Sequence, residues 1–172
     1  MQDNDMNSSF STLVLLTLKE LRLERNMHQG VLAQAAGKTP NAWSKIESGQ
    51  SSLTIDGMIG ACSAMQIRPS DVMNIVERLV TVFNHYGVFF HTVPIGENED
   101  DLLPMILAYY SSNGYQALKN RPNERVSIST IGNPFITPTI PTIVRYCCEP
   151  NYREWMDNQP SITKMIPSEL VS

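Results

Sequence analysis

Residues 18–50 read LKELRLERNMHQGVLAQAAGKTPNAWSKIESGQ, and this stretch decides how the first half of the chain folds. One helical pattern ends at Gly37 and another ends at Gly49, and glycine commonly closes a helix in a left-handed conformation. Between them Thr39 precedes Pro40, which is typical of a helix start. The threonine hydroxyl caps free N–H groups, and proline lacks an N–H that the first turn leaves unbonded. The stretch therefore predicts two short helices that are separated by a tight turn.

The helical pattern continues on both sides of this stretch. Upstream, apolar residues recur at helical spacing from Val14 to Leu21, with the charged residues, among them Glu20, expected to face solvent. Residues 1–8 are polar and are expected to be frayed. Five short helices joined by tight turns predict a compact all-α domain over residues 9–80. These helices are expected over 9–25, 29–36 and 39–48, and then from Thr54 and from Ser70.

After Val80 the sequence is typical of a small α+β domain over residues 81–172. Val88–Val93 reads VFFHTV and predicts a strand, and Arg125–Ile131 alternates with period two and predicts a second strand. Two strands with short helices suggest a sensory fold similar to a PAS domain, an interpretation of shape alone. The remaining expected segments are a helix up to about Tyr110, an extended segment over Phe135–Pro141, and a helix from Thr142 that is interrupted near Pro150.

Composition excludes several classes of protein. Of the 172 residues 42% are hydrophobic and 17% are charged, so the chain can bury a core and does not have the composition of a disordered protein. The longest apolar run, residues 10–18, is too short to span a membrane and lacks the features of a secretory signal. Three cysteines, two of them adjacent, favour reduced thiols and therefore a cytoplasmic protein.

The net charge of −4 is unevenly distributed along the chain. Residues 12–80 carry seven Lys or Arg and six Asp or Glu, a net charge of +1, whereas residues 81–172 carry six basic and nine acidic residues. A domain at +1 is only a modest ligand for a polyanion. Binding to DNA would therefore depend on a dimer, on direct base contacts, or on both.

The expected helix over 39–48 divides into two sides. The inner side is apolar apart from Glu47, and Trp43 is interpreted there as a core residue. The outer side carries short polar side chains and one basic residue. A helix in the major groove of DNA needs such side chains for close approach and for contacts to base edges. The alternative is an ordinary amphipathic helix with no ligand. The outer residues are Pro40, Asn41, Ser44, Lys45 and Ser48.

The neighbouring residues favour the first interpretation, because residues 9–80 resemble the Cro/C1-type helix-turn-helix family (XRE family) of bacterial and phage transcription regulators. No single residue is specific to this family, and it is the number in register that carries the resemblance. The residues that carry it are Leu18, Leu21, Arg22, Gln29, Leu32, Ala33, Gly37, Ser44, Ile46, Glu47 and Gly49.

The resemblance implies a set of DNA contacts. Asn41 and Lys45 match positions that read base edges, where pairing with adenine or guanine contributes about 1–3 kcal/mol each. Pro40 departs from the usual polar residue and can offer only an apolar contact, and His28 departs from the usual helix cap. The expected DNA-binding residues are Gln29, Thr39, Pro40, Asn41, Ser44, Lys45 and Ser48.

The resemblance also implies a structural ion pair between Arg22 and Glu47, which ties the first helix to the end of the recognition helix. Its alternative is two unrelated surface charges, which would contribute almost nothing to stability. Because Glu47 lies on the apolar side of its helix, the buried pair is the favoured interpretation.

The second half carries no catalytic or metal-binding pattern. His85, His91 and the cysteines Cys147 and Cys148 match no zinc spacing, and the acidic run GENEDD at 96–101 lacks the order of a calcium loop. We interpret that run as a solvated loop whose last acids start a helix. Neither an enzyme nor a cofactor is expected. The many aromatic residues could form a core, line a ligand pocket or make a dimer interface.

These observations predict a cytoplasmic, sequence-specific transcription regulator that binds a double-stranded DNA operator as a homodimer through the helix over 39–48. A small molecule or a protein could act as effector on residues 81–172, and no membrane partner is expected. One alternative is an antitoxin-like protein whose second half binds a protein partner. Another is an enzyme or ligand carrier whose helical domain no longer binds DNA.

Overall fold

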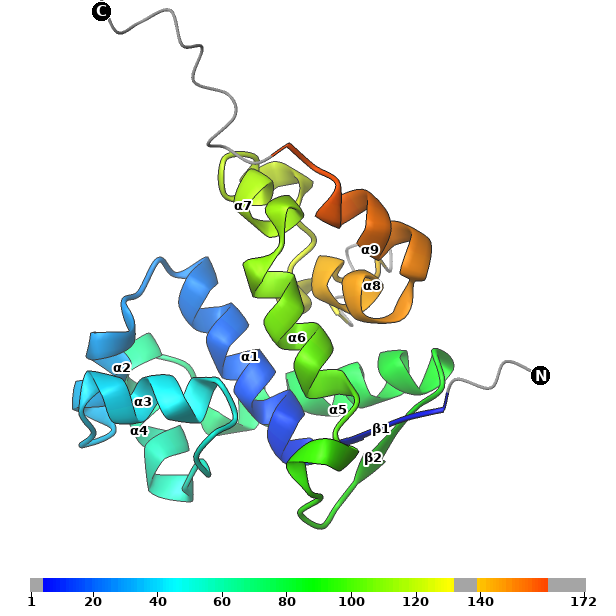
Figure 1. The fold of residues 1–172 in the computed structure, drawn as a ribbon. Helices are drawn as coiled ribbons and strands as arrows, with labels where there is room; N and C mark the ends of the chain where they lie inside the picture. Colours follow the sequence, from blue (N-terminus) through cyan, green and yellow to red (C-terminus); the bar gives the residue numbers. More distant parts are fainter. Residues whose placement is uncertain (1–4, 132–138, 161–172) are drawn as a thin grey trace, which may run out of the picture.

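The computed structural model of the 172-residue chain describes residues 5–131 and 139–160. Within these two ranges the fold is helical, with nine α-helices, three short 3-10 helices and one two-stranded sheet (Figure 1). No helix in them is long and apolar enough to cross a membrane. The extended segment expected at 135–141 lies mostly outside the described residues.

The first half contains the five expected helices. Hydroxyl groups of Ser9, Thr39 and Thr54 cap three of them by accepting a hydrogen bond from a backbone N–H in the first turn. His28 caps another, because its Nδ1 accepts from the N–H of Gly30 at 3.1 Å, which accounts for a histidine at that position. The helices are α1 (Phe10–Glu24), α2 (Gln29–Ala35), α3 (Pro40–Glu47), α4 (Ile55–Met65) and α5 (Pro69–His85).

The expectation of a frayed N-terminus over residues 1–8 is wrong for Met6–Ser8, which form strand β1 together with Ser9. This strand runs parallel to β2 (Val88–His91), with Met6 opposite Val88. On the other side of β1, the N–H of Asp101 donates to the carbonyl of Asn7 at 2.8 Å, and the Asn7 N–H donates to the Asp101 carboxylate. The polar N-terminal segment is ordered because it satisfies backbone groups that β2 and the following loop expose.

The second half is more helical than the sequence predicted. The strand expected over Arg125–Ile131 is wrong, because this segment contains the 3-10 helix Ile128–Thr130 and pairs with no strand. Since β2 is the only strand in the described part of residues 81–172, nothing supports a PAS-like fold there. Its helices are α6 (Leu102–Ser111), α7 (Asn113–Lys119), α8 (Thr142–Cys148) and α9 (Pro150–Asp157), with further 3-10 helices at Glu97–Glu99 and Pro122–Glu124.

Helix α1 lies between the two halves (Figure 1). It packs against α3, α4 and α5 on one side and against α6 and the 3-10 helix Ile128–Thr130 on the other. The expectation that Glu20 faces solvent is therefore wrong: its side chain is 1% exposed. The boundary placed at Val80 in the sequence lies inside α5, which continues to His85.

Tyrosine side chains fill the interior of the second half. The ring of Tyr109 lies 5.1 Å from those of Tyr110 and Tyr115 and 5.4 Å from that of Tyr146, measured between ring centres. Tyr109, Tyr115 and Tyr146 are buried, so these aromatic residues are core residues. Phe89 and Trp155 are exposed instead.

Candidate nucleic-acid interface

Helix α3 separates its buried and exposed side chains as the sequence indicated. Trp43, Ile46 and Glu47 are buried against the rest of the first half. The opposite side is polar and carries one positive charge. Its exposed residues are Pro40, Asn41, Ser44 and Lys45, preceded by the exposed cap Thr39 and followed by the half-buried Ser48.

A network of hydrogen bonds on Glu47 fixes the position of α3. Its carboxylate accepts from Arg22 twice, from Nε at 2.7 Å and from Nη2 at 3.0 Å. It also accepts from Gln29 Nε2 at 2.6 Å and from Trp43 Nε1 at 3.0 Å. The third nitrogen of Arg22, Nη1, donates to the carbonyl of Met27 at 2.8 Å. The structure thus brings the expected Arg22–Glu47 pair together in the interior, where a fully bonded pair holds α1, α2 and α3 in one arrangement.

The sequence did not identify Trp43 and Gln29 as partners of Glu47. The spacing in the sequence could have indicated the contact of Trp43, since Trp43 lies four residues before Glu47 and the two side chains share one helix face. The contact of Gln29 depends on the packing of α2 against α3 and had no local signal. An amide nitrogen carries two N–H bonds, so one of them is still available for a phosphate.

Besides Gln29, two more of the expected DNA contacts are already engaged within the protein. The Ser48 hydroxyl donates to the carbonyl of Lys45 at 3.1 Å, so a phosphate contact requires this hydroxyl to rotate. The Thr39 hydroxyl accepts from the N–H of Ala42 at 3.2 Å, and because acceptance leaves its own proton free, it can still donate to a phosphate. The exposed Lys38, in the turn before α3, is a further candidate phosphate contact that the sequence analysis did not include.

Two glycines fit the backbone around α3. Gly37 has φ of +66° and Gly49 has φ of +77°, a region that side-chain-bearing residues rarely adopt. A Cβ added at Gly49 would also lie 2.8 Å from a methyl carbon of Leu103 in α6. The end of α3 is therefore in direct contact with the second half of the chain.

The charged groups of α1 connect this network to the second half. The ammonium of Lys19 lies 4.0 Å from the centre of the Tyr110 ring. Burial lowers the pKa of Lys19, and the nearby Glu47 carboxylate opposes that effect. The next residue, Glu20, accepts from the hydroxyl of Tyr110 at 2.7 Å and from Arg125 Nη2 at 2.6 Å.

The described residues contain no group of metal ligands, and burial keeps two of the cysteine thiols protonated. In residues 5–131 and 139–160, no three His, Cys, Asp or Glu side chains are grouped as metal ligands. Burial raises the pKa of the Cys147 thiol well above its usual range and that of Cys148 to about 12. Both are therefore protonated at neutral pH, the unreactive form of a thiol.

Comparison with known proteins identifies one part of the chain. Residues 18–72 match the family model described as helix-turn-helix, which confirms the resemblance seen in the sequence. The match covers α2, α3 and α4, residues 18–24 of α1 and the first turn of α5. Searches of the curated proteins and of the solved structures found no match.

Proposed function

We propose that this chain, whose residues 18–72 form a Cro/C1-type helix-turn-helix domain of the XRE family, is a cytoplasmic transcription regulator that binds a specific operator as a homodimer. Helix α3 lies in the major groove and its exposed side chains contact the bases. The observation that carries this proposal is that buried hydrogen bonds hold α3 in a fixed position. A fully bonded Glu47 holds the helix from inside, while its outer face is free of large apolar side chains.

Each exposed residue of α3 has a role that fits its chemistry. Lys45 donates to the O6 and N7 acceptors of guanine, and Asn41 pairs with adenine through its amide. Pro40 contacts a thymine methyl group. The surrounding groups position the domain on the phosphates through Thr39, Ser44, Ser48, the second N–H of Gln29 and the N-terminus of α2.

The proposed DNA-binding unit consists of two copies of the chain. One recognition helix contacts few base pairs, whereas a two-fold dimer reads two half-sites about one helical turn apart. Two large apolar side chains on α4 support such a partner, because Ile55 is 74% exposed and Ile59, one turn further on, is 49% exposed. Burying them against another protein surface would remove apolar area from water.

Selection of bound duplexes from a random DNA library tests the proposal. We expect an enriched inverted repeat, and we expect Lys45→Ala to lose the preference at one position of each half-site. Removal of a bidentate base contact weakens binding by about 1–3 kcal/mol. Binding should also fall steeply with added salt, since phosphate contacts release counterions.

Lys119→Ala is the matched control, because Lys119 is also an exposed lysine and lies on α7, in the second half. This variant should select the same repeat as the unaltered protein. If a folded protein enriches no sequence at low salt, or if both lysine variants change the selected sequence alike, α3 is not a base reader.

A further inference from the structure

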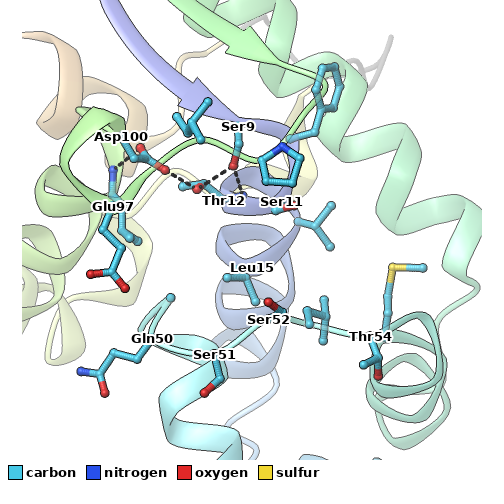
Figure 2. A pocket seen from close by; sticks show the side chains of 18 of the residues that line it. Ser9, Ser11, Thr12, Leu15, Gln50, Ser51, Ser52, Thr54, Glu97 and Asp100 are labelled. Carbon is cyan, nitrogen blue, oxygen red and sulfur yellow. Dashed lines mark hydrogen bonds between the residues drawn. The ribbon is translucent and has the colours of Figure 1, made fainter.

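A cavity of about 480 Å³ lies where the first half meets the second (Figure 2). Three segments line it: the first turns of α1, the loop over residues 49–54 together with the first turn of α4 that follows it, and the segment over residues 94–103 that leads from β2 into α6. Its volume lies within the range of about 300–1,000 Å³ that is usual for sites of small organic ligands.

The walls of this cavity are apolar with hydroxyl groups between the apolar side chains. Leu15 from α1, Leu53 and Met58 from the α4 side and Leu103 from α6 supply apolar surface. Ser51 and Ser52 stand on the loop after α3, and Figure 2 shows them on the far side of the cavity from Asp100. Such a lining suits an organic ligand with an apolar body and a few polar groups.

The charged groups of the cavity are both acidic. Its lining residues, all within the described part of the chain, include Glu97 and Asp100 and no Lys, Arg or His. Asp100 is buried, and both of its carboxylate oxygens are hydrogen-bonded within the protein. Oδ1 accepts from the Ser8 hydroxyl and from the N–H groups of Leu102 and Leu103. Oδ2 accepts from the Thr12 hydroxyl at 2.6 Å. Glu97 is exposed, and in Figure 2 its carboxylate extends toward the loop that carries Gln50 and Ser51.

The loop that forms one wall is coupled to the recognition helix. The N–H groups of Gln50 and Ser51 donate to the carbonyl of Lys45 at 2.8 and 3.1 Å. Gly49, the first residue of the loop, lies against Leu103, itself a wall of the cavity. A molecule in the cavity therefore contacts both the segment that positions the end of α3 and the residue on which that segment rests.

We propose that this cavity binds a small hydrophobic amine as an effector. The ammonium group pairs with the carboxylate of Glu97, and the apolar body packs on Leu15, Leu53 and Leu103. An anionic ligand such as a nucleotide or a carboxylate is disfavoured, since it would meet only negative charge. Occupancy shifts the loop over residues 49–54 and so changes the affinity of α3 for DNA; this second part rests on the proposed function, whereas the binding itself does not.

Three probes of nearly equal shape that differ in charge test the binding: tryptamine (cationic), tryptophol (neutral) and indole-3-acetate (anionic). Chemical-shift titration of the full-length protein without DNA gives each dissociation constant. We expect tryptamine to bind at least about tenfold more tightly than indole-3-acetate. Glu97→Gln should weaken tryptamine binding about fivefold and leave tryptophol binding unchanged.

Glu154→Gln is the matched control for charge, because Glu154 is exposed on α9 and does not line the cavity. Leu15→Trp tests the location, since a larger side chain at position 15 takes up space on the apolar wall where the probes are expected to pack and should weaken binding of all three probes, while the melting temperature stays near that of the unaltered protein. No binding of tryptamine at millimolar concentration, equal affinity for the amine and the acid, or equal effects of the two glutamate variants would overturn the proposal.

The coupling is tested with the selected operator. Saturating tryptamine should change the operator affinity, and bound operator should change the tryptamine affinity by the same factor, as thermodynamic linkage requires. Operator binding that is unaffected by bound tryptamine overturns the effector role. If no duplex binds at all, the proposed function fails, and the titrations without DNA still decide whether the amine site exists.

Discussion

At Glu47, four N–H groups from α1, α2 and α3 converge on one carboxylate that is 7% exposed. A buried charge costs little only when it is paired and hydrogen-bonded, and here both oxygens are. None of these groups faces the proposed DNA surface. They determine instead whether the exposed side chains of α3 are presented in a fixed orientation.

Arg22→Ala should destabilise the protein by about 3–5 kcal/mol, because it leaves the Glu47 charge buried with only two neutral donors. Operator affinity should fall with it, since α3 loses its tie to α1. Chemical denaturation gives the change in the free energy of unfolding, and a titration at a temperature where the variant is still folded gives the affinity.

Arg68→Ala is the matched comparison. Arg68 makes the same bidentate contact with the Asp71 carboxylate, from Nε at 3.0 Å and from Nη2 at 2.9 Å, but its side chain is 80% exposed. Solvent screens such a pair, so the melting temperature should hardly change. An Arg22→Ala variant as stable as Arg68→Ala would show that burial does not strengthen the Arg22–Glu47 pair.

At the scale of the element, α1 has two covered faces. Its apolar spacing predicted the face that packs on α5, but the same spacing also predicted that Glu20 points to solvent. Periodicity shows which side of a helix is apolar and says nothing of a second layer on the polar side. The second half supplies that layer, and Tyr110 and Arg125 satisfy the buried carboxylate of Glu20.

The stability of this contact should depend on pH. Burial raises the pKa of Glu20 above its ordinary value of 4.5, and the Arg125 charge only partly opposes this. A group whose pKa is raised by folding contributes stability at low pH and loses it as the pH rises through the folded pKa. The free energy of unfolding of Glu20→Gln minus that of the unaltered protein should therefore become more positive as the pH rises from about 4.5 to about 8.

Denaturation at several pH values measures this difference. Glu124→Gln serves as the control, because the Glu124 side chain is 52% exposed, and its difference should stay nearly constant with pH. A constant or falling difference for Glu20→Gln would mean that Glu20 is not held at a raised pKa in the folded protein.

At the scale of the whole molecule, the N-terminal strand joins the two halves. β1 precedes α1 but pairs with β2, which follows α5. Asp100 strengthens the junction, because it caps the start of α6 while it accepts from Ser8 and Thr12 at the other end of the chain. With α1 also shared, we expect the described parts to unfold together.

Asp100→Ala tests this cooperation. It leaves buried hydroxyl and N–H groups without an acceptor, at about 1–3 kcal/mol for each group left unpaired. Trp43 fluorescence in a Trp155→Phe background reports on the first half, and near-ultraviolet circular dichroism of the buried tyrosines reports on the second. Both transitions should have one midpoint, and Asp100→Ala should lower both equally. Separate midpoints, or a shift of one alone, would show two independent units.

The sequence by itself determined the five helices of the first half and the polarity of α3. Caps at Thr39 and Thr54, glycines at positive φ and helical spacing act over a few residues, so they can be interpreted without knowledge of the rest. The Arg22–Glu47 pair came from resemblance to a family, because nothing local joins two residues in different helices.

Only the tertiary structure decided where the polar segments lie. Alternation over Arg125–Ile131 indicates a strand only if a neighbouring strand is there to bond it, and in the described chain none is. Met6–Ser9 form a strand because β2 presents unpaired backbone groups to them. Glu20 is buried because α6 packs against α1 and brings Tyr110, 90 residues further along the chain, into contact with it. The cavity beside Glu97 likewise exists because three segments far apart in the sequence meet there, and such meetings depend on packing that no short-range pattern specifies.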